Sequence, residues 1–379
     1  FEAVVQQDGL EFQYMSEIDS YVLASVGEQA AGNVVIPERI NGKKVTAILA
    51  RAFQANKQIT SVEIPDTVTS IGEYAFESCS LTSVKLPANI TEIAAGVFEN
   101  SQLTFVSIPD QVTSIGEEAF YNCPLETVDF SDSVQELGIR AFAVCSNLQE
   151  IDLPDGIREI PEGCFQHCDL LERAGLPEGL EIIGKEAFQG TALADVEFPE
   201  TLTAIEEEAF AYCGEIKEVT IPGSVKYVGY RIFAGCRALE RAILEDGVED
   251  LSTAFADCSN LKEIYIPDSV YSISLYPLGE GITIYGNTGS KAYLYCQEKG
   301  IAFVSLGTAV LEQPVIICEI EQGNNIHVAL EARCDNADFY DYVIAESEDF
   351  PESGEALYQM NKTRNTERDW KNLDQGVYY

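Results

Sequence analysis

The stretch Leu103-Thr-Phe-Val106-Ser-Ile108-Pro109-Asp-Gln-Val112-Thr-Ser-Ile115-Gly116-Glu-Glu-Ala119-Phe120-Tyr-Asn-Cys123 is one complete unit of a repeat that runs through most of the chain. Its first part alternates apolar and polar residues, which is the periodicity of a β-strand. Pro109 ends that strand because proline has no N–H to donate to a sheet. The Val-x-x-Ile-Gly segment then turns the chain, and we expect the Ala-Phe pair to pack the far side of a coil.

A phenylalanine marks each copy of this unit. It recurs ten times, and every step is 22 or 23 residues. A proline recurs with the same period, with Ser131 and Glu245 in the two positions that lack it. One coil cannot bury its own apolar face, whereas stacked coils bury it as a continuous core. The ten phenylalanines are Phe53, Phe76, Phe98, Phe120, Phe142, Phe165, Phe188, Phe210, Phe233 and Phe255.

A period of 22–23 residues lies in the range of leucine-rich repeats. The sequence therefore predicts a β-rich leucine-rich-repeat solenoid of about ten repeats, wound as a right-handed coil, with edges near residues 30 and 306. Such a stack needs caps, because an end coil would otherwise expose its core. We expect residues 10–26 to form a hairpin cap. Asn41-Gly42 is a tight-turn signal that lengthens the first repeat.

The order strand, Ile-Pro, Val-x-x-Ile-Gly, Ala-Phe, x-x-Cys resembles the BspA-like leucine-rich repeats of bacterial surface proteins. The resemblance covers roughly residues 30–306, and residues 285–303 look like the helix-then-strand piece that closes such solenoids. It implies a protein that attaches to host or neighbouring-cell proteins at the cell surface. A fold does not by itself fix a function, so this role is an expectation.

After Leu306 the repeat pattern stops, which places a domain boundary between 1–306 and 307–379. Ile326, Val328 and Leu330 share one face of a predicted strand, and Tyr340, Tyr342 and Ile344 share a face of another. Short strands with turn signals between them suggest a β-sandwich, and this stretch resembles an Ig or fibronectin type III-like module. Such a module normally needs about 100 residues, so we expect this one to be incomplete.

The chain is strongly acidic. Its 63 Asp and Glu outnumber 23 Lys and Arg, which gives a formal net charge of −40. This charge repels phosphate backbones and anionic membranes, so we expect a protein partner, basic or of extracellular-matrix type, and no nucleic acid. The alternative is that the charge only serves solubility and self-repulsion. We expect the chain to be a monomer. We find no run of 18 apolar residues and therefore expect no membrane span. The start at Phe1 suggests a mature or trimmed chain without its signal or anchor.

Seven of the eleven cysteines occupy one repeat position, three residues after the phenylalanine. Asn56, Ser101 and Thr191 take the same position elsewhere, so it requires a small, weakly hydrogen-bonding side chain that points inward. We therefore expect a ladder of buried free thiols. Cys164-x-x-His167-Cys168 only superficially resembles a zinc site, because Cys168 belongs to this ladder and His167 lies at a variable, solvated position. The ladder cysteines are Cys79, Cys123, Cys145, Cys168, Cys213, Cys236 and Cys258.

Little in the sequence indicates catalysis. The chain has two histidines, His167 and His327, and no glycine-rich phosphate loop between a strand and a helix. A nucleophile paired with histidine would need residues that this fold does not easily bring together. We therefore expect no enzyme activity, no catalytic residues, no cofactor and no metal.

The expected binding surface is the concave strand face, where the third and fifth residues of each L-x-x-L-x-L segment point to solvent. Asp129, Glu150 and Asp152 should form one acidic patch there. A second patch should combine Asp195, Glu197 and Glu218, with Arg173 between the two. Exposed aromatic residues suit interface anchors. The candidate ligand-binding residues are Phe105, Asp129, Glu150, Asp152, Arg173, Asp195, Glu197, Glu218 and Tyr265.

Three functions are compatible with this surface. An adhesin-like protein would use the face to bind proteins of other cells or of the matrix. A structural stalk would bind nothing specifically, and its strand face would be an ordinary solvated one. A carbohydrate-binding surface protein would need stacked, exposed aromatic side chains on one face.

Overall fold

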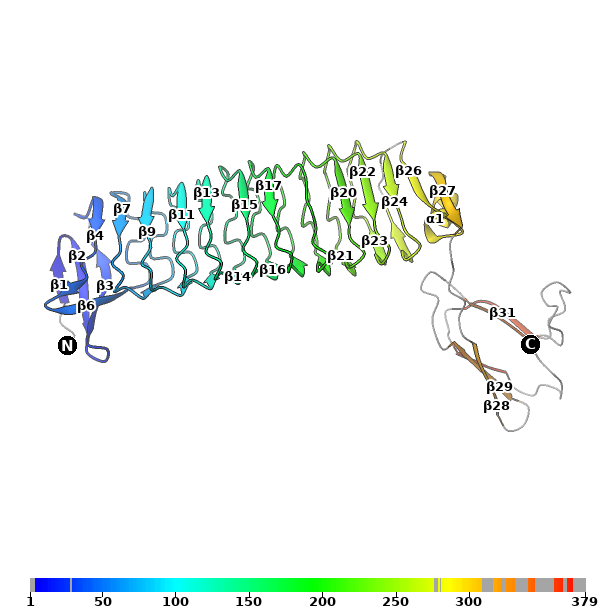
Figure 1. Ribbon diagram of the computed structural model, residues 1–379, viewed down its shortest axis with the longest axis horizontal. Helices are drawn as coiled ribbons and strands as arrows, with labels where there is room; N and C mark the ends of the chain where they lie inside the picture. The colour runs from blue at the N-terminus through cyan, green and yellow to red at the C-terminus, as the bar shows by residue number, and fades with distance from the viewer. Residues whose placement is uncertain are drawn as a thin grey trace.

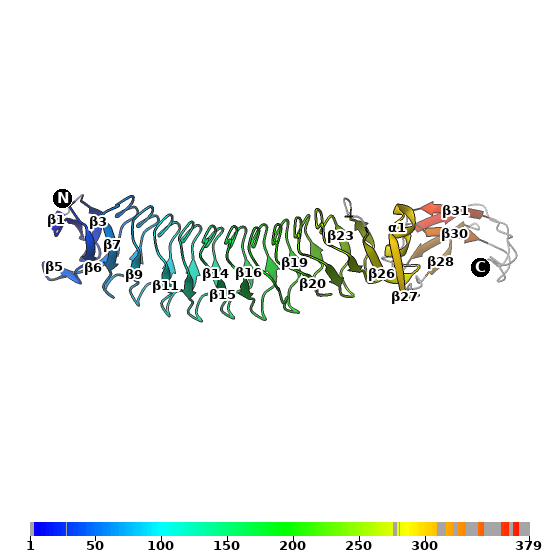
Figure 2. The same cartoon turned by 90° about the horizontal axis from the view of Figure 1, so that it is seen from above.

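The computed structural model describes residues 4–27, 29–275, 279 and 281–308, and beyond them the backbone of five strands between residues 316 and 370. Residues 32–308 form a stack of coils, seen from two directions in Figures 1 and 2. Every coil but the one at residues 194–198 begins with a strand of the main row, and the paired strands of this row are parallel. The row contains β4 (Gly32–Val35), β7 (Ile59–Glu63), β9 (Ser83–Lys85), β11 (Phe105–Ser107), β13 (Thr127–Asp129), β15 (Glu150–Asp152), β17 (Arg173–Gly175), β20 (Glu218–Ile221), β22 (Arg241–Leu244), β24 (Glu263–Tyr265), β26 (Thr283–Thr288) and β27 (Ala302–Thr308).

A second row of short parallel strands forms where each Val-x-x-Ile segment turns the chain. A third set of hydrogen bonds joins the phenylalanine segments, for example from Phe120 N–H to the Ala141 carbonyl at 2.8 Å. The coils are thus held together by backbone hydrogen bonds on three sides. The second row contains β6 (Lys43–Ile48), β8 (Ser70–Ile71), β10 (Glu92–Ile93), β12 (Ser114–Ile115), β14 (Glu136–Leu137), β16 (Glu159–Ile160), β18 (Ile182–Ile183), β19 (Ala204–Ile205), β21 (Tyr227–Val228), β23 (Asp250–Ser252) and β25 (Ser272–Ser274).

The solenoid has about 13 turns rather than the ten that the phenylalanines mark. Ten main-row positions precede a phenylalanine, and one of these, residues 194–198, has no assigned strand. The turns that begin at β24, β26 and β27 lack the marker phenylalanine, and they add three to the ten. The periodicity therefore identified the fold but undercounted the stack at its C-terminal end.

The main row is interrupted between β9 and β11, between β13 and β15, and on both sides of residues 194–198. At three of these four breaks, the two neighbouring turns differ in the length of the loop that precedes the strand. Either one residue or two separate the cysteine position from the first residue of the next L-x-x-L-x-L segment, as in Cys123-Pro-Leu125 and Cys145-Ser-Asn-Leu148. A one-residue difference shifts the strand relative to its neighbour and weakens the ladder, although β7 and β9 pair despite such a difference.

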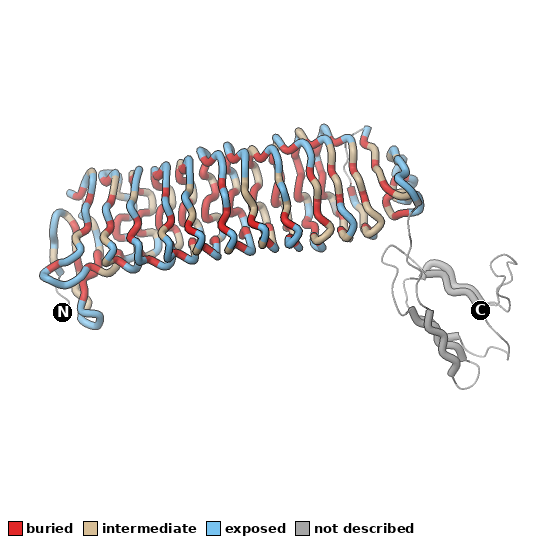
Figure 3. The backbone as a smooth tube through the Cα atoms, viewed as in Figure 1, coloured by how far each residue is buried: buried red, intermediate tan, exposed pale blue. Residues whose placement is uncertain are grey.

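The core of the solenoid is a continuous stack of phenylalanine rings. Phe142 is fully buried, and its ring centroid lies 5.2 Å from that of Phe120 and 5.6 Å from that of Phe165, both nearly parallel. Figure 3 shows the resulting alternation of buried and exposed positions along every coil. The same stacking continues from Phe53 to Phe255. All ten marker phenylalanines are buried, so they pack inside the coil as predicted.

The chain reverses around each phenylalanine through two left-handed residues, two positions before it and two after it. Glycine suits these positions, as at Gly163 and Gly190. Val144 has a φ of 61°, which crowds its branched side chain against the backbone. This strain belongs to the turn and not to the core.

Replacing Val144 by glycine should therefore stabilise the protein by about 1 kcal/mol, because relief of the strain exceeds the extra chain entropy of glycine. The matched change, Gly190→Ala, should destabilise it, since φ there is +74° and a Cβ would lie 2.7 Å from His167 Nδ1. Urea unfolding, monitored by circular dichroism, measures the unfolding midpoints of both variants. A lower midpoint for Val144→Gly would refute the strain.

Antiparallel strands close the N-terminal end of the stack. β1 (Val4–Gln7), β2 (Leu10–Met15) and β3 (Ser20–Val26) pair in order, and β3 then pairs in parallel with β6. Asn41 and Gly42 form the tight turn between β5 (Arg39–Ile40) and β6, both with positive φ, as the dipeptide predicts. The hairpin buries Phe12 and Leu23 against the first coils.

At the C-terminal end, helix α1 (Lys291–Lys299) lies between β26 and β27. Ser290 caps its N-terminus by accepting from the Tyr293 N–H, and Gly300 ends it in the left-handed conformation. Farther on, β28 (Ile316–Glu321), β29 (Asn325–Leu330) and β32 (Glu367–Trp370) form an antiparallel sheet, while β30 (Tyr340–Ile344) pairs with β31 (Tyr358–Thr363). The predicted fibronectin type III-like packing of side chains lies outside the described residues.

Candidate binding surface

The outward residues of the main row form one long face, which we call the strand face. Its side chains are the third and fifth residues of each segment, and the residues between them point into the core. Phe105 is 51% exposed there, as its place in the segment predicts, and its role as an anchor stays a prediction. Asp129, Asp195 and Glu197 are also exposed on this face.

Arg173 connects two acidic residues of the preceding turn. Its guanidinium donates to both oxygens of Asp152, at 2.6 and 2.8 Å, and to Glu150 Oε2 at 3.2 Å. These hydrogen bonds hold the pKa of Asp152 below its ordinary value. Because all three side chains are more than half exposed, we expect the ion pairs to add little to stability. Their effect is to fix one guanidinium across two carboxylates.

This arrangement differs from the predicted pair of acidic patches. Arg173 lies between the two acidic groups along the row, but its guanidinium binds back to Glu150 and Asp152 and neutralises part of the first group. Asp129 accepts a hydrogen bond from Ser107 at 2.9 Å, and the row is interrupted between its strand and that of Glu150. Glu218 of the second predicted patch pairs with Arg241 at 3.2 Å. The predicted acidic residues do share the strand face. However, Arg173 and Arg241 neutralise some of them, so the negative charge is not continuous along the face.

An apolar ladder runs along the last four strands of the face. Ile243 is paired with Tyr265, Tyr265 with Tyr285, and Tyr285 with Val304. The two tyrosine rings stack with centroids 4.4 Å apart and planes inclined by 9°. Tyr265 was predicted to be exposed, but it is half-buried because Tyr285 covers one ring face. We call Ile243, Tyr265, Tyr285 and Val304 the tyrosine ladder.

Charged side chains lie beside the tyrosine ladder. Arg241 donates from Nε to Glu263 Oε2 at 2.8 Å and from its terminal nitrogen to Glu218. Tyr285 donates its hydroxyl to Glu263 Oε1 at 3.5 Å, and its pKa is raised by burial and by the nearby Glu263 carboxylate. Sequence reasoning assigned Tyr285 to the C-terminal cap and not to the strand face, because neither the repeat proline nor the marker phenylalanine follows it. The alternation Thr283-Ile-Tyr285, one strand after Glu263-Ile-Tyr265, could have revealed it.

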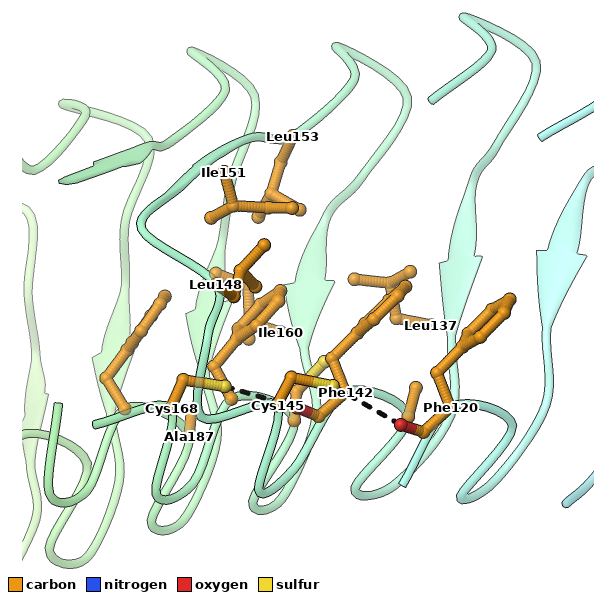
Figure 4. Close-up of a cluster of buried hydrophobic side chains, with 14 of the residues drawn as sticks. Phe120, Leu137, Phe142, Cys145, Leu148, Ile151, Leu153, Ile160, Cys168 and Ala187 are labelled. Atoms are coloured by element: carbon orange, nitrogen blue, oxygen red, sulfur yellow. Dashed lines mark hydrogen bonds between the residues drawn. The ribbon is translucent and has the colours of Figure 1, made fainter. Parts of the chain in front are cut away.

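The cysteine ladder is a feature of the core and not of the surface, as predicted. In all seven cases the thiol Sγ lies 2.8–3.3 Å from the carbonyl oxygen of the phenylalanine one turn earlier and donates to it. Figure 4 shows two of these bonds, from Cys145 to Phe120 and from Cys168 to Phe142. Burial raises the pKa of Cys168 to about 12, so the thiolate form is suppressed. These thiols are therefore structural.

The remaining candidates for chemistry differ in their exposure to solvent. Cys164 is buried and its pKa is raised well above the ordinary value by burial, whereas His167 is exposed. Within the described residues no group of three His, Cys, Asp or Glu is arranged to hold a metal ion. Cys318 and Cys334 have no described side chains. The expectation that the protein is not an enzyme stays a prediction.

A parallel β-solenoid with an open, polar strand face defines the class of leucine-rich-repeat interaction scaffolds. Six overlapping copies of the BspA type leucine rich repeat region match this sequence and together span residues 25–280. This is more than half of the chain, and the protein therefore belongs to the BspA-type leucine-rich repeat family. Comparison with curated proteins found no match.

Solved structures of leucine-rich repeat proteins are similar to this chain. One from Bacteroides ovatus is 24% identical, with a TM-score of 0.56, and the match covers 80% of this chain and 99% of that one. A leucine rich cell surface protein from Faecalibacterium prausnitzii is 23% identical, covering 70% and 94%, with a TM-score of 0.35. The pneumococcal vaccine antigen PcpA is 18% identical, covering 82% and 99%, with a TM-score of 0.44. The first of these supports the fold.

Proposed function

We propose that this chain is a secreted or cell-surface binding protein of adhesin-like type, whose strand face holds proteins of a host, of neighbouring cells or of the extracellular matrix. The observation that carries the proposal is the tyrosine ladder. Tyrosine is enriched among residues that contribute most to protein–protein affinity. Here two tyrosines and two aliphatic side chains adjoin on rigid strands, so little side-chain freedom is lost on binding.

Location and charge support the same proposal. The BspA-type repeats are like those of bacterial surface proteins, which supports a secreted or surface location. Separately, no helix among the described residues is long and apolar enough to span a membrane. The net charge of −40 favours encounter with a basic partner and suppresses binding to acidic ones. We therefore expect the affinity to fall as salt is raised.

A protein partner suits the ladder better than a carbohydrate. Sugars stack on open aromatic faces, but Tyr265 and Tyr285 cover each other at 4.4 Å, and Ile243 and Val304 flank the pair. A structural stalk without a ligand would not need the tyrosine ladder, nor the acidic residues bridged by Arg241 beside it. The tyrosine edges and hydroxyls instead suit the mixed polar and apolar contacts of a protein interface.

A binding screen tests the proposal. The purified chain is passed over immobilised extracellular-matrix and cell-surface proteins at physiological salt, and any hit is measured again with Tyr265→Ala/Tyr285→Ala. We expect the double variant to bind at least about tenfold more weakly, as for truncated aromatic hot spots. The control is Tyr227→Ala, because Tyr227 is 57% exposed but lies on the second row. Equal losses in both variants, or no hit in the panel, would contradict the proposal.

A further inference from the structure

A cleft of about 550 Å³ opens on the strand face where the main row is interrupted. One side is the segment 194–198, and the other comes from β20 and its flanking residues. Val196 and Phe198 are half-buried in its wall, and the Phe198 ring packs edge-on against Phe210. The cleft exists because the strand ladder is broken on this side while the phenylalanine stack behind it stays continuous.

Backbone groups along this cleft are open. Among the described residues, the N–H and C=O groups of residues 195–198 have no backbone partner, and β20 pairs with β22 but with no strand on its other edge. Where the main row is continuous, as from β20 to β24, the ladder satisfies such groups. An interrupted parallel row thus offers hydrogen-bonding capacity to an added ligand.

The charge of the cleft is strongly negative. Five carboxylates and one amine line it, and Glu218 is already paired with Arg241. Asp195 and Glu197 have neither an ion pair nor a hydrogen bond to any described residue. The acidic residues are Asp195, Glu197, Glu200, Glu218 and Glu245, and the amine belongs to Lys217.

The same strand positions bind a guanidinium two turns earlier. Glu150 and Asp152 are the third and fifth residues of their segment, and the third residue of the next turn is Arg173, which bridges them. Asp195 and Glu197 occupy the corresponding positions, but the next turn presents Glu218 where Arg173 would stand. The fold therefore repeats the two acidic acceptors without the arginine.

We propose that this cleft receives an arginine side chain from an extended segment of a partner protein. Its guanidinium takes the position that Arg173 takes against Glu150 and Asp152, and pairs with Asp195 and Glu197. Its aliphatic stem lies along Val196 and Phe198, and open backbone carbonyls accept its remaining N–H groups. Arginine suits the cleft better than lysine because a planar fork can serve two carboxylates at once. The inference rests on the proposed function in that the ligand is a polypeptide.

The test uses the whole chain and three peptides of sequence Ac-Thr-Xaa-Val-Xaa-Val-Thr-NH2, in which Xaa is arginine, lysine or the uncharged isostere citrulline. Isothermal titration calorimetry at physiological salt measures their affinities. We expect the citrulline peptide to bind at least about tenfold more weakly than the arginine peptide, and the lysine peptide to lie between them. Asp195→Asn/Glu197→Gln should weaken the arginine peptide by a similar factor.

Glu136→Gln/Glu159→Gln is the matched control, because it removes the same number of charges from exposed positions of the second row, away from the strand face. It should leave the peptide affinity within about twofold. Equal losses in both double variants would show attraction to the overall charge and overturn the proposal. The proposal would also be overturned if the citrulline or lysine peptide bound as tightly as the arginine peptide. A third contrary result would be that the chain self-associates and that Asp195→Asn/Glu197→Gln abolishes this self-association. Peptide binding is independent of the tyrosine ladder, so the screen above can fail while this test succeeds.

Discussion

Replacing Phe142 by alanine should lower the free energy of unfolding by about 3–5 kcal/mol, as for other buried large-to-small changes. Phe142 is fully buried and contacts the rings of Phe120, Phe165 and Phe130. The neighbouring coils cannot close the gap, because backbone hydrogen bonds fix their spacing on both sides of the ring. Urea unfolding monitored by circular dichroism measures the loss.

The shape of the transition carries further information. In a solenoid each coil contacts its neighbours only, so a hole in the middle weakens the coupling between the two halves. Phe142→Ala should therefore broaden the transition or divide it in two, whereas Val144→Gly should not. The control is Phe105→Ala, since Phe105 is 51% exposed and should change stability by less than about 0.5 kcal/mol. Similar effects of both alanine variants would rule out the ring stack as the main source of stability.

The sequence was most informative where each turn repeats the one before it. The phenylalanine and cysteine positions recur at fixed spacing, so their burial follows from periodicity, and the structure confirms both. A count by phenylalanine omits the turns of β24, β26 and β27, which keep the strand alternation without that residue, although the segment of β24 was recognised through Tyr265. Tyr285 lies in one of these turns, and the tyrosine ladder could not be completed without it.

Side-chain partners on the strand face were harder to predict. The third and fifth residues of each strand could be placed, but the sequence did not show that Arg173 turns back toward Asp152. Nor did it show the cleft beside residues 194–198. That cleft depends on whether neighbouring strands stay in register, which a one-residue difference in the preceding loop can disturb. The alternation of 22- and 23-residue steps was the available signal.

Alkaline pH should destabilise this protein through its cysteine ladder. Burial raises the pKa of Cys123, Cys168 and Cys258 from an ordinary value near 9.0 to about 12 in the folded chain. Since the unfolded chain loses these protons first, their contribution is fully present below about pH 9 and is lost as pH rises towards 12. Each thiol should remove about 1.4 kcal/mol of stability per pH unit in that window.

The variant Cys123→Ser/Cys168→Ser/Cys258→Ser isolates this effect, because Ser101 already occupies the same repeat position and is buried there. The variant should be less stable than the parent at pH 7.5, since the smaller side chains pack less well. Between pH 7.5 and pH 10, however, it should lose roughly 4 kcal/mol less than the parent, as three thiols no longer ionise on unfolding. Urea unfolding at the two pH values gives this difference directly, and lysine and tyrosine ionisation cancels because both proteins share those groups. Equal losses in the two proteins would mean that the ladder thiols are already accessible to solvent in the folded state, and the carbonyl-bonded ladder of Figure 4 would then be wrong.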